Sequence, residues 1–304
     1  MAAPQNYPET DQTASSDVMK AASIDYINTF TKGVQGLMKM LGIFQPVVVP
    51  NGSTIKTYKY TDKLADGAVA EGELIPLSKT TKAVDQTITL ALKKWRKSAT
   101  AEAIQEKGRQ GAVDETDARL ILGIQDKLKK DLFASVTGTE KTSDNGSTLQ
   151  ETVANMWGKL VTLFEDYDGV TDPDAEGGDQ MVYFVNPLDV AAQMGSTPVL
   201  TQNVFGFKYI KDFLGMGTAI VSANVTKGSV FGTAAQNLKF AYVPANGGDL
   251  SDAFGLTSDA TGVIGMTHSV NTANASIDTL AMGSWAVFAE TKDGVLKGTI
   301  SPSR

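Results

Sequence analysis

Two strand-like runs that lie far apart in the sequence constrain this chain most. From Val84 to Leu92 the side chains alternate, with Val84, Gln86, Ile88, Leu90 and Leu92 on one face and mostly polar side chains on the other. Such alternation is typical of a half-exposed antiparallel strand. The expected partner is Thr54–Tyr60, and more than twenty residues separate the two runs, too many for a tight hairpin turn. The sequence therefore predicts a long two-stranded arm within residues 51–97.

This arm sets a stability problem for an isolated subunit. An isolated two-stranded ribbon is only marginally stable in water. The connection between the runs holds the stretch Ala70–Ser78, which contains a glycine and a proline and no catalytic or metal motif. We therefore expect the arm to lie on another protein surface, and a neighbouring copy of the same chain is the simplest candidate.

The composition excludes several kinds of chemistry. The chain has no cysteine and a single histidine, His268, so disulfides, thiol catalysis and metal sites built on several imidazoles are excluded. The net charge of −7 disfavours tight nucleic-acid binding by the chain as a whole. Residues 1–12 lack the apolar core of a secretory signal, and no apolar run reaches membrane-spanning length. We expect a soluble protein made in the cytoplasm.

Three stretches have helical patterns. Residues 17–41 carry apolar side chains at helical spacing, which predicts an amphipathic helix packed on protein. A second helix is expected from Asp114 to Gly138, with Asp117 in its first turn complementing the helix dipole. Thr148 and Glu151 have the spacing of a capping box and predict a third helix.

The second half of the chain reads as alternating strands and turns. The apolar run Met181–Val185 predicts a buried strand, after which Asn186 caps a helix and Pro187 takes its first position. Further strands are expected at the following places: Thr218–Ala223, Val230–Thr233 and Phe240–Pro244. The turn Lys292–Gly294 between two β-rich runs predicts a terminal hairpin.

An acidic loop, residues 165–179, holds seven carboxylates and no basic residue. The spacing of Asp172, Asp174 and Glu176 suggests a calcium loop and makes these three the weak candidates for a metal site. Pro173 lies inside the pattern, and Tyr183 stands where a bidentate glutamate is required. The sequence therefore favours a solvated loop over a metal site.

A basic cluster surrounds the first tryptophan of the chain. It consists of Lys93, Lys94, Trp95, Arg96 and Lys97. Basic residues with an aromatic side chain suit either nucleic acid or an interface that meets carboxylates. No other pattern predicts catalysis or a cofactor, since no pair of carboxylates is fixed in a cleft and His268 lies in a Gly/Thr-rich run typical of a structural histidine.

The order of these features resembles the major capsid proteins of tailed bacteriophages with the Hong Kong 97-type fold. Val69–Gly72 with Ile75-Pro76 resembles the extended loop of that family, and Phe184–Pro187 resembles its axial domain. Gly217–Ala223 with Lys227–Gly232 resembles a late hairpin of the axial domain. The other matching stretches are, in order, Asp85–Lys97, Ala101–Ala103, Asp114–Gly138, Trp285–Val287 and Val295–Ile300.

The resemblance implies an α+β fold in four parts. These are an N-terminal arm with an amphipathic helix (1–50), an extended β-hairpin loop (51–97), a peripheral domain with a long spine helix (98–147 and 250–304) and an axial domain (148–249). It implies a structural, non-enzymatic subunit that forms the pentamers and hexamers of an icosahedral head. The interface candidates are Glu71, Glu73, Lys93, Lys94, Trp95, Arg96 and Lys97.

The resemblance also implies partners. They are copies of the chain, a portal protein, packaged double-stranded DNA in non-specific contact, and a separate scaffolding protein, because fewer than twenty residues precede the first expected helix. No membrane partner is expected, and the location is the virion capsid, assembled in the host bacterial cytoplasm. Some members of the family join subunits covalently through a loop lysine, but Lys63, Lys79 and Lys82 are ordinary loop lysines and do not predict it.

Two other functions stay open at this point. An encapsulin-type compartment shares the fold and packages an enzyme, and the genes beside this one would separate it from a phage capsid. A carboxylate-based hydrolase would require a cleft with two carboxylates of opposed pKa, which the sequence does not predict.

Overall fold

The computed structural model describes residues 15–41, 46–50, 52–70, 72–138, 141–165, 181–194, 202–204, 207–211 and 213–301. The chain forms two compact units, and each is built from three separate stretches of sequence. Unit 1 comprises residues 1–32, 92–127 and 243–284, and unit 2 comprises residues 33–91, 128–242 and 285–304. The predicted division into four parts stays a prediction.

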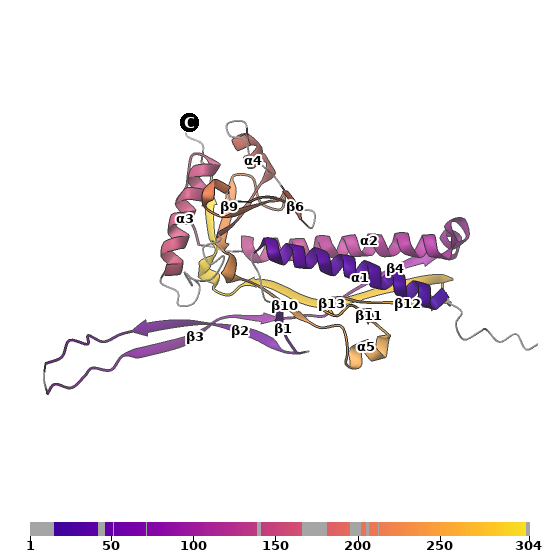
Figure 1. Cartoon of the computed structure of the whole chain (residues 1–304), viewed down its shortest axis with the longest axis horizontal. Helices are drawn as coiled ribbons and strands as arrows, with labels where there is room; N and C mark the ends of the chain where they lie inside the picture. Colours follow the sequence, from indigo (N-terminus) through magenta and orange to yellow (C-terminus); the bar gives the residue numbers. More distant parts are fainter. Residues whose placement is uncertain are drawn as a thin grey trace, which may run out of the picture. The chain divides into compact units, whose positions relative to one another are not determined.

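Unit 1 is a helix-on-sheet unit (Figure 1). The long strand β13 (Ser276–Ala289) pairs antiparallel with β12 (Gly265–Asn271) and with β4 (Lys93–Thr100), and β12 pairs with β11 (Thr257–Ser258). The helices that contribute to unit 1 are α1 (Ser15–Met40), α2 (Ala101–Thr137) and the short α5 (Asp249–Phe254). The residues Ala99, Ala112, Val113 and Ile277 form a core cluster between β4, α2 and β13.

Unit 2 contains the predicted hairpin. Strand β2 (Thr54–Lys63) pairs antiparallel with β3 (Lys79–Thr89) over its whole length. Strand β1 (Val47–Val48) pairs parallel with β10 (Leu238–Val243), which lies next to β13. The two-stranded arm expected from the alternating run is therefore present, and its tip comprises the described residues 64–70 and 72–78 (Figure 1).

A second sheet of unit 2 surrounds a fully buried strand. Strand β5 (Met181–Val185) pairs parallel with β8 (Thr218–Val221) and antiparallel with β9 (Ser229–Ala234). The sheet extends through β14 (Leu296–Thr299) on one side, and through β7 (Phe207–Ile210) and β6 (Gln202–Val204) on the other. Helix α3 (Leu149–Glu165) packs on β9 and β14 through a buried face, and α4 (Pro187–Met194) follows β5. The described residues also contain three single turns of 3-10 helix, η1 (Phe213–Gly215), η2 (Ala235–Asn237) and η3 (Lys292–Gly294).

The local helix signals are confirmed. Glu151 N–H donates to Thr148 Oγ1 at 3.1 Å, and a Glu151 carboxylate oxygen accepts from the backbone N–H of Ser147 at 2.8 Å, which together satisfy donors at the start of α3. The Asn186 side chain accepts from Leu188 N–H at 2.9 Å, and Pro187 begins α4. In α1, Phe30, Val34 and Leu37 are buried as the helical spacing predicts, and so is Leu41 directly after the helix.

The predicted start of the second helix is wrong. Helix α2 begins at Ala101 and contains one non-helical residue, Gly108, with φ 75° and ψ 157°. Gly108 therefore separates a short first leg from the long second leg, and Asp114 lies inside that second leg. Asp117 does not complement a helix terminus, because its side chain is 1% exposed and hydrogen-bonded within unit 1.

Two predicted hairpins are also wrong. Strands β8 and β9 do not pair with each other but lie on either side of β5. Strand β14 pairs with β9, whereas β13 belongs to another sheet, so the turn Lys292–Gly294 joins two sheets and does not close a terminal hairpin. The tight pair β12–β13 was not predicted, because its run of Gly, Thr, Ser and Asn resembles a loop.

Candidate interaction sites

The base of the β2–β3 hairpin contains a β-bulge. Thr57 pairs with Gln86 and Tyr58 with Val84, so Asp85 has no partner on β2. Because paired residues lie on one face of a ribbon, Gln86 shares a face with Thr57 and Val84 lies on the opposite face with Tyr58. The predicted single face from Val84 to Leu92 is therefore wrong at Val84, and Leu92 lies beyond the end of β3.

The bulge directs two neighbouring side chains toward the turn η3. Asp85 Oδ2 accepts from the backbone N–H of Lys292 at 3.2 Å, and Gln86 Nε2 donates to the carbonyl of Ala289. In a regular strand these two side chains would point to opposite faces. The extra residue thus allows both to dock the hairpin base on the same segment of unit 2.

An ion-pair group completes this docking. Lys59 Nζ lies 2.9 Å from Asp293 Oδ2, and Lys141 Nζ lies 3.7 Å from the same oxygen. The hydrogen bond from Lys59 is the largest of the effects that hold the pKa of Asp293 below its ordinary value, and the positive charges of Lys141 and Lys59 act in the same direction. We call the contacts of Lys59, Asp85, Gln86 and Lys141 with residues 289–293 the hairpin clasp.

A buried asparagine holds the turn that carries the clasp. Asn237 is 1% exposed, and its Nδ2 donates to the Thr291 carbonyl and to Thr233 Oγ1, both at 3.0 Å. Its Oδ1 accepts from Thr291 N–H at 2.7 Å. Because the amide of Asn237 is bonded at both ends, the turn that presents Asp293 is anchored in the core of unit 2.

Apolar packing at the hairpin base is limited to a few residues. Ile55, Ile88 and Leu90 pack against a small cluster of Val49, Ala241 and Phe288. Farther out, Lys82 Nζ lies 3.8 Å from the centre of the Tyr58 ring and 5.4 Å from that of Tyr60. The outer half of the ribbon is therefore held by its own pairing and by contacts between its two strands.

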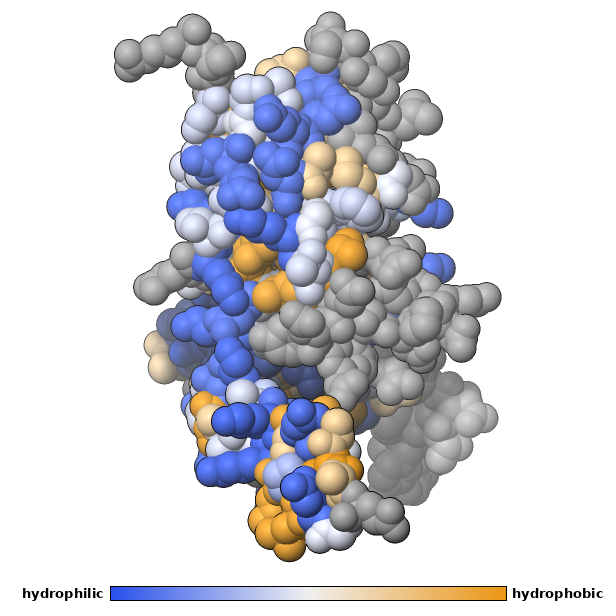
Figure 2. All heavy atoms as spheres, turned by 90° about the vertical axis from the view of Figure 1, so that its left-hand side faces the viewer, coloured by the Kyte–Doolittle hydropathy of each residue, from blue (hydrophilic) through white to orange (hydrophobic). Residues whose placement is uncertain are grey.

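The hairpin tip presents large apolar side chains to solvent. The exposed fractions of Leu64, Leu74, Ile75 and Leu77 are 84%, 93%, 72% and 96%. Figure 2 views the hairpin from this end, and apolar atoms gather there at the bottom of the picture. Of the two candidate glutamates near the tip, Glu73 accepts a hydrogen bond from Ala70 N–H, and Glu71 lies outside the described residues. Such an apolar cluster on an extended ribbon is a typical contact surface.

The basic cluster of β4 divides between two faces of the strand. Arg96 lies 2.5 Å from Asp278 on β13, whose pKa is lowered first by a hydrogen bond from Ser98 and further by Asn271 and Arg96. This contact with a carboxylate lies within one subunit, and the interface role of the basic cluster stays a prediction. Lys94 shares the Arg96 face, whereas Lys93, Trp95 and Lys97 alternate onto the face where α2 contributes Asp117.

A buried polar group in unit 1 was missed by the sequence reasoning. Asp117 of α2 accepts from Thr279 Oγ1 at 2.6 Å and lies 2.8 Å from Nε2 of His268. Tyr26 lies nearby, and its pKa is raised by burial first and then by the carboxylates of Asp114 and Asp117. His268 is therefore half of a side-chain pair that joins β12 to α2, as its interpretation as a structural histidine implied.

The described residues contain no cluster of three or more metal-ligating side chains. Asp172, Asp174 and Glu176, together with residues 166–179 of the acidic loop, lie outside the described residues. Four described carboxylates have a pKa below the ordinary range, namely Glu115, Glu151, Asp278 and Asp293. Within the described part of the chain no helix is long and apolar enough to cross a membrane.

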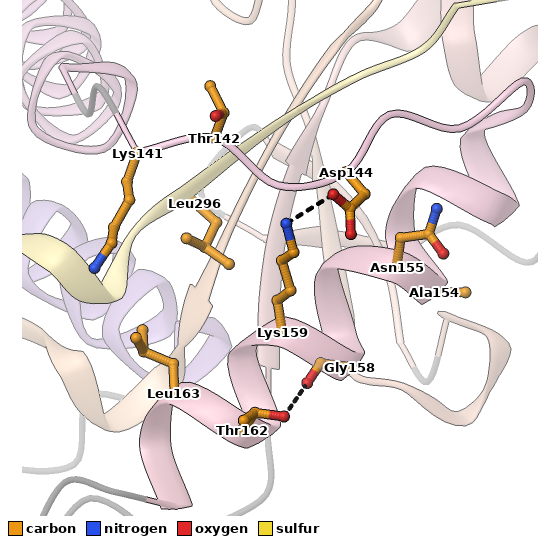
Figure 3. A pocket seen from close by; sticks show the side chains of 10 residues that line it. All are labelled: Lys141, Thr142, Asp144, Ala154, Asn155, Gly158, Lys159, Thr162, Leu163 and Leu296. Atoms are coloured by element: carbon orange, nitrogen blue, oxygen red, sulfur yellow. Dashed lines mark hydrogen bonds and ion pairs between the residues drawn. The ribbon is translucent and has the colours of Figure 1, made fainter.

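An open pocket of about 670 Å³ lies beside α3 (Figure 3). Gly158 faces open space on the helix surface. Lys159 Nζ lies 2.8 Å from Asp144 Oδ1. Leu163 and Leu296 supply apolar walls, and Lys141 extends to the other side (Figure 3). The pocket contains no nucleophile paired with a base, and the sequence Gly158-Lys159 lies within a helix and not in a phosphate-binding loop.

Comparison with known proteins identifies the fold. Neither a family model nor a curated protein sequence matches this chain. Among solved structures, the holo-SrpI encapsulin complex from Synechococcus elongatus has a TM-score of 0.53 at 11% identity, over 86% of this chain and 87% of that chain. The capsid of Cyanophage P-SCSP1u has a TM-score of 0.49 at 8% identity, over 85% of this chain and 86% of that chain. A solved structure from Mycobacterium phage Patience has a TM-score of 0.48 at 12% identity, over 94% of this chain and 90% of that chain.

The fold assignment rests on the encapsulin structure, whose TM-score is above 0.5. At 11% identity the likeness concerns the fold and not the function. It agrees with two features that the sequence predicted, namely the long hairpin and the long helix α2. The chain has the Hong Kong 97-type capsid fold.

Proposed function

We propose that the chain is the structural subunit of an icosahedral bacteriophage head. Many copies form pentamers and hexamers, which enclose double-stranded DNA. The observation that carries this proposal is the hairpin tip, where four large apolar side chains are 72–96% exposed on a ribbon whose base is docked on unit 2. A ribbon of this kind gains stability when its tip is buried on a neighbouring copy.

Several further observations support a structural role and not an enzymatic one. The carboxylates Glu115, Glu151, Asp278 and Asp293 are stabilised in the charged form by hydrogen-bond donors, whereas a general acid needs a raised pKa. The single histidine is engaged with a buried aspartate. The fold is that of protein shells. The proposed partners are copies of this chain, a separate scaffolding protein, a portal protein and the packaged DNA, in a virion assembled in the host cytoplasm.

Electron microscopy and light scattering of the purified chain, with and without a co-expressed scaffolding protein, test the proposal. We expect closed shells or capsomers. The double variant Leu74→Asp with Leu77→Asp should lose assembly while the melting temperature of the subunit changes little, because both side chains are almost fully exposed. The matched control, Leu74→Met with Leu77→Met, keeps an apolar tip and should assemble. A wild-type chain that stays a folded monomer under all these conditions would argue against the proposal.

An encapsulin-type compartment is the second candidate. The observation that supports it is the TM-score of 0.53 to an encapsulin complex. The two functions differ in what the shell contains. Shells purified after nuclease treatment should protect DNA if the chain forms a phage head, and should hold a co-purifying enzyme if it forms a compartment. The genes beside this one give the same answer, because portal and terminase genes accompany a capsid gene.

A further inference from the structure

A basic pocket in unit 1 was not predicted from the sequence. It has a volume of about 330 Å³ and lies between β4 and the two legs of α2 that meet at Gly108. Its charged lining residues are Lys97 from β4, Lys107 from the first leg, and Glu115 and Arg119 from the second. The left-handed backbone of Gly108 brings the first leg back over the second, so that residues eight positions apart can touch.

The charges in this pocket do not cancel. Lys107 Nζ lies 2.6 Å from Glu115 Oε2, and this hydrogen bond is the largest of the effects that lower the pKa of Glu115. The only acidic residue of the lining is thus already paired. Among the described residues, no carboxylate lies within ion-pair distance of Lys97 or Arg119. The pocket therefore keeps two positive charges in a chain whose net charge is −7.

We propose that this pocket binds a phosphate-type oxyanion, and that its ligand in the particle is the backbone phosphate of packaged DNA. The second half of this inference rests on the proposed function. An arginine beside a lysine suits a phosphate group, because the guanidinium supplies a planar pair of N–H donors and the ammonium adds a point charge. A double helix meets many copies of the pocket on a shell wall, so weak contacts are sufficient.

The surrounding sequence agrees with this assignment. Ten lysines and arginines and six carboxylates lie between Lys93 and Lys130, so this stretch is positive while the rest of the chain is strongly negative. Exposed charges act over a Debye length of about 8 Å at physiological salt. The acidic remainder of the chain therefore weakens the long-range attraction of DNA. It does not neutralise the positive charges of Lys97 and Arg119 inside the pocket.

The experiment measures the binding of a short double-stranded DNA of mixed sequence to the purified full-length subunit over a range of salt concentrations. Each phosphate that a protein neutralises on B-DNA changes the slope of log K against log salt by about 0.9. The variant Lys97→Gln with Arg119→Gln should therefore reduce the slope by about 1.8 and weaken binding at low salt. The control Lys94→Gln with Lys130→Gln removes the same charge from exposed positions outside the pocket and should leave most of the slope unchanged.

A second variant changes binding in the opposite direction. Glu115→Gln removes the only carboxylate of the lining and should tighten DNA binding and inorganic phosphate binding several-fold. Equal slopes for the pocket variant and the control would overturn the proposal, and so would a wild-type subunit that binds DNA without salt dependence. A pocket variant that binds DNA normally but fails to assemble would overturn it too, because the pocket would then hold a carboxylate of a neighbouring copy.

These outcomes are separate from the test of the proposed function. Assembly is observed by electron microscopy, and the slope is measured on the subunit before assembly. If shells form and the slope does not change, only the pocket inference fails. If no shells form under any condition, the proposed function fails, and inorganic phosphate binding still decides whether the pocket is an anion site.

Discussion

At the scale of single residues, Gly108 decides the shape of α2. Its φ of 75° and ψ of 157° lie in a region that is essentially restricted to glycine. A Cβ added at Gly108 would meet nothing within 4 Å, so the obstacle to another residue is the backbone conformation and not crowding. Gly123 in the same helix also faces open space but has no positive φ, and it provides a matched comparison.

We therefore predict opposite effects for two alanine substitutions in α2. Gly108→Ala should lower the free energy of unfolding by about 1–3 kcal/mol, because alanine is strained in this conformation. Gly123→Ala should raise it by about 0.5–1 kcal/mol, because alanine is favoured over glycine inside a helix. Denaturant unfolding of both variants checks this, and a stabilised Gly108→Ala variant would show that the break in α2 is not fixed by its backbone.

The buried group around Asp117 leads to a second prediction. Thr279→Val keeps the volume of the side chain but removes the donor to Asp117 Oδ1, leaving a buried carboxylate oxygen without that partner. The expected loss is about 1–3 kcal/mol of unfolding free energy. Thr87→Val, at an exposed position on β3, should change stability little in the same thermal or denaturant measurement. Equal effects of the two variants would contradict a structural role for the Asp117 group.

The sequence predicted local residue roles but not distant ones. The caps formed by Thr148 and Asn186 use partners within three residues, so spacing alone reveals them. The partners of Asp117 are 151 and 162 positions away, and nothing near Asp117 in the sequence distinguishes it from an ordinary helix-terminal aspartate. Gly108 carries no signal of its own either, because an isolated glycine in a helical pattern is often tolerated.

At the scale of elements, the hairpin was predictable and its bulge was not. The alternation of Val84–Leu92 is unbroken in the sequence, and the phase change appears only when β3 is paired with β2. The wrong terminal hairpin has the same cause, since a turn motif such as Lys292–Gly294 does not reveal that β14 pairs with β9 from a distant part of the chain. The interface role of the basic cluster stays a prediction, although Arg96 does meet a carboxylate.

The clasp should respond to pH in a defined direction. The pKa of Asp293 is lowered in the docked hairpin. The charged carboxylate therefore stabilises docking fully above the ordinary carboxyl pKa of about 4, and this stabilisation is lost as the pH falls through the lowered pKa of Asp293. Both Lys59 and Asp293 are nearly half exposed, so their pair contributes about 0–1 kcal/mol. Lys59→Gln should therefore raise amide hydrogen exchange at the hairpin base at neutral pH by up to about five-fold.

The control and the low-pH arm make this prediction specific. Lys56→Gln on the same strand removes an equal charge at an exposed position and should leave amide exchange unchanged. Below the lowered pKa of Asp293, the wild-type and Lys59→Gln proteins should exchange at the same rate. A difference between them that persists in acid would mean that the Lys59 side chain acts by packing and not through Asp293.

At the scale of the whole molecule, we expect shells held by non-covalent contacts. Of the loop lysines Lys63, Lys79 and Lys82, Lys82 lies over a tyrosine ring, and Lys63 and Lys79 face each other across the last pair of the ribbon. Boiled and denatured particles should run as a single band near 32.2 kDa, and a ladder of heavier bands would disprove the prediction.

The long strand β13 belongs to both units, with residues 276–284 in unit 1 and 285–289 in unit 2. During translation, therefore, unit 1 cannot close until Ser284 has emerged from the ribosome, and unit 2 cannot close until β14 has emerged and can pair with β9. Multidomain chains usually fold from the N-terminus as each domain is completed. Here α1, β4 and the hairpin must wait with their apolar faces uncovered. Nascent chains therefore need chaperone protection for a long interval. The surfaces that contact neighbouring copies form together, late in translation.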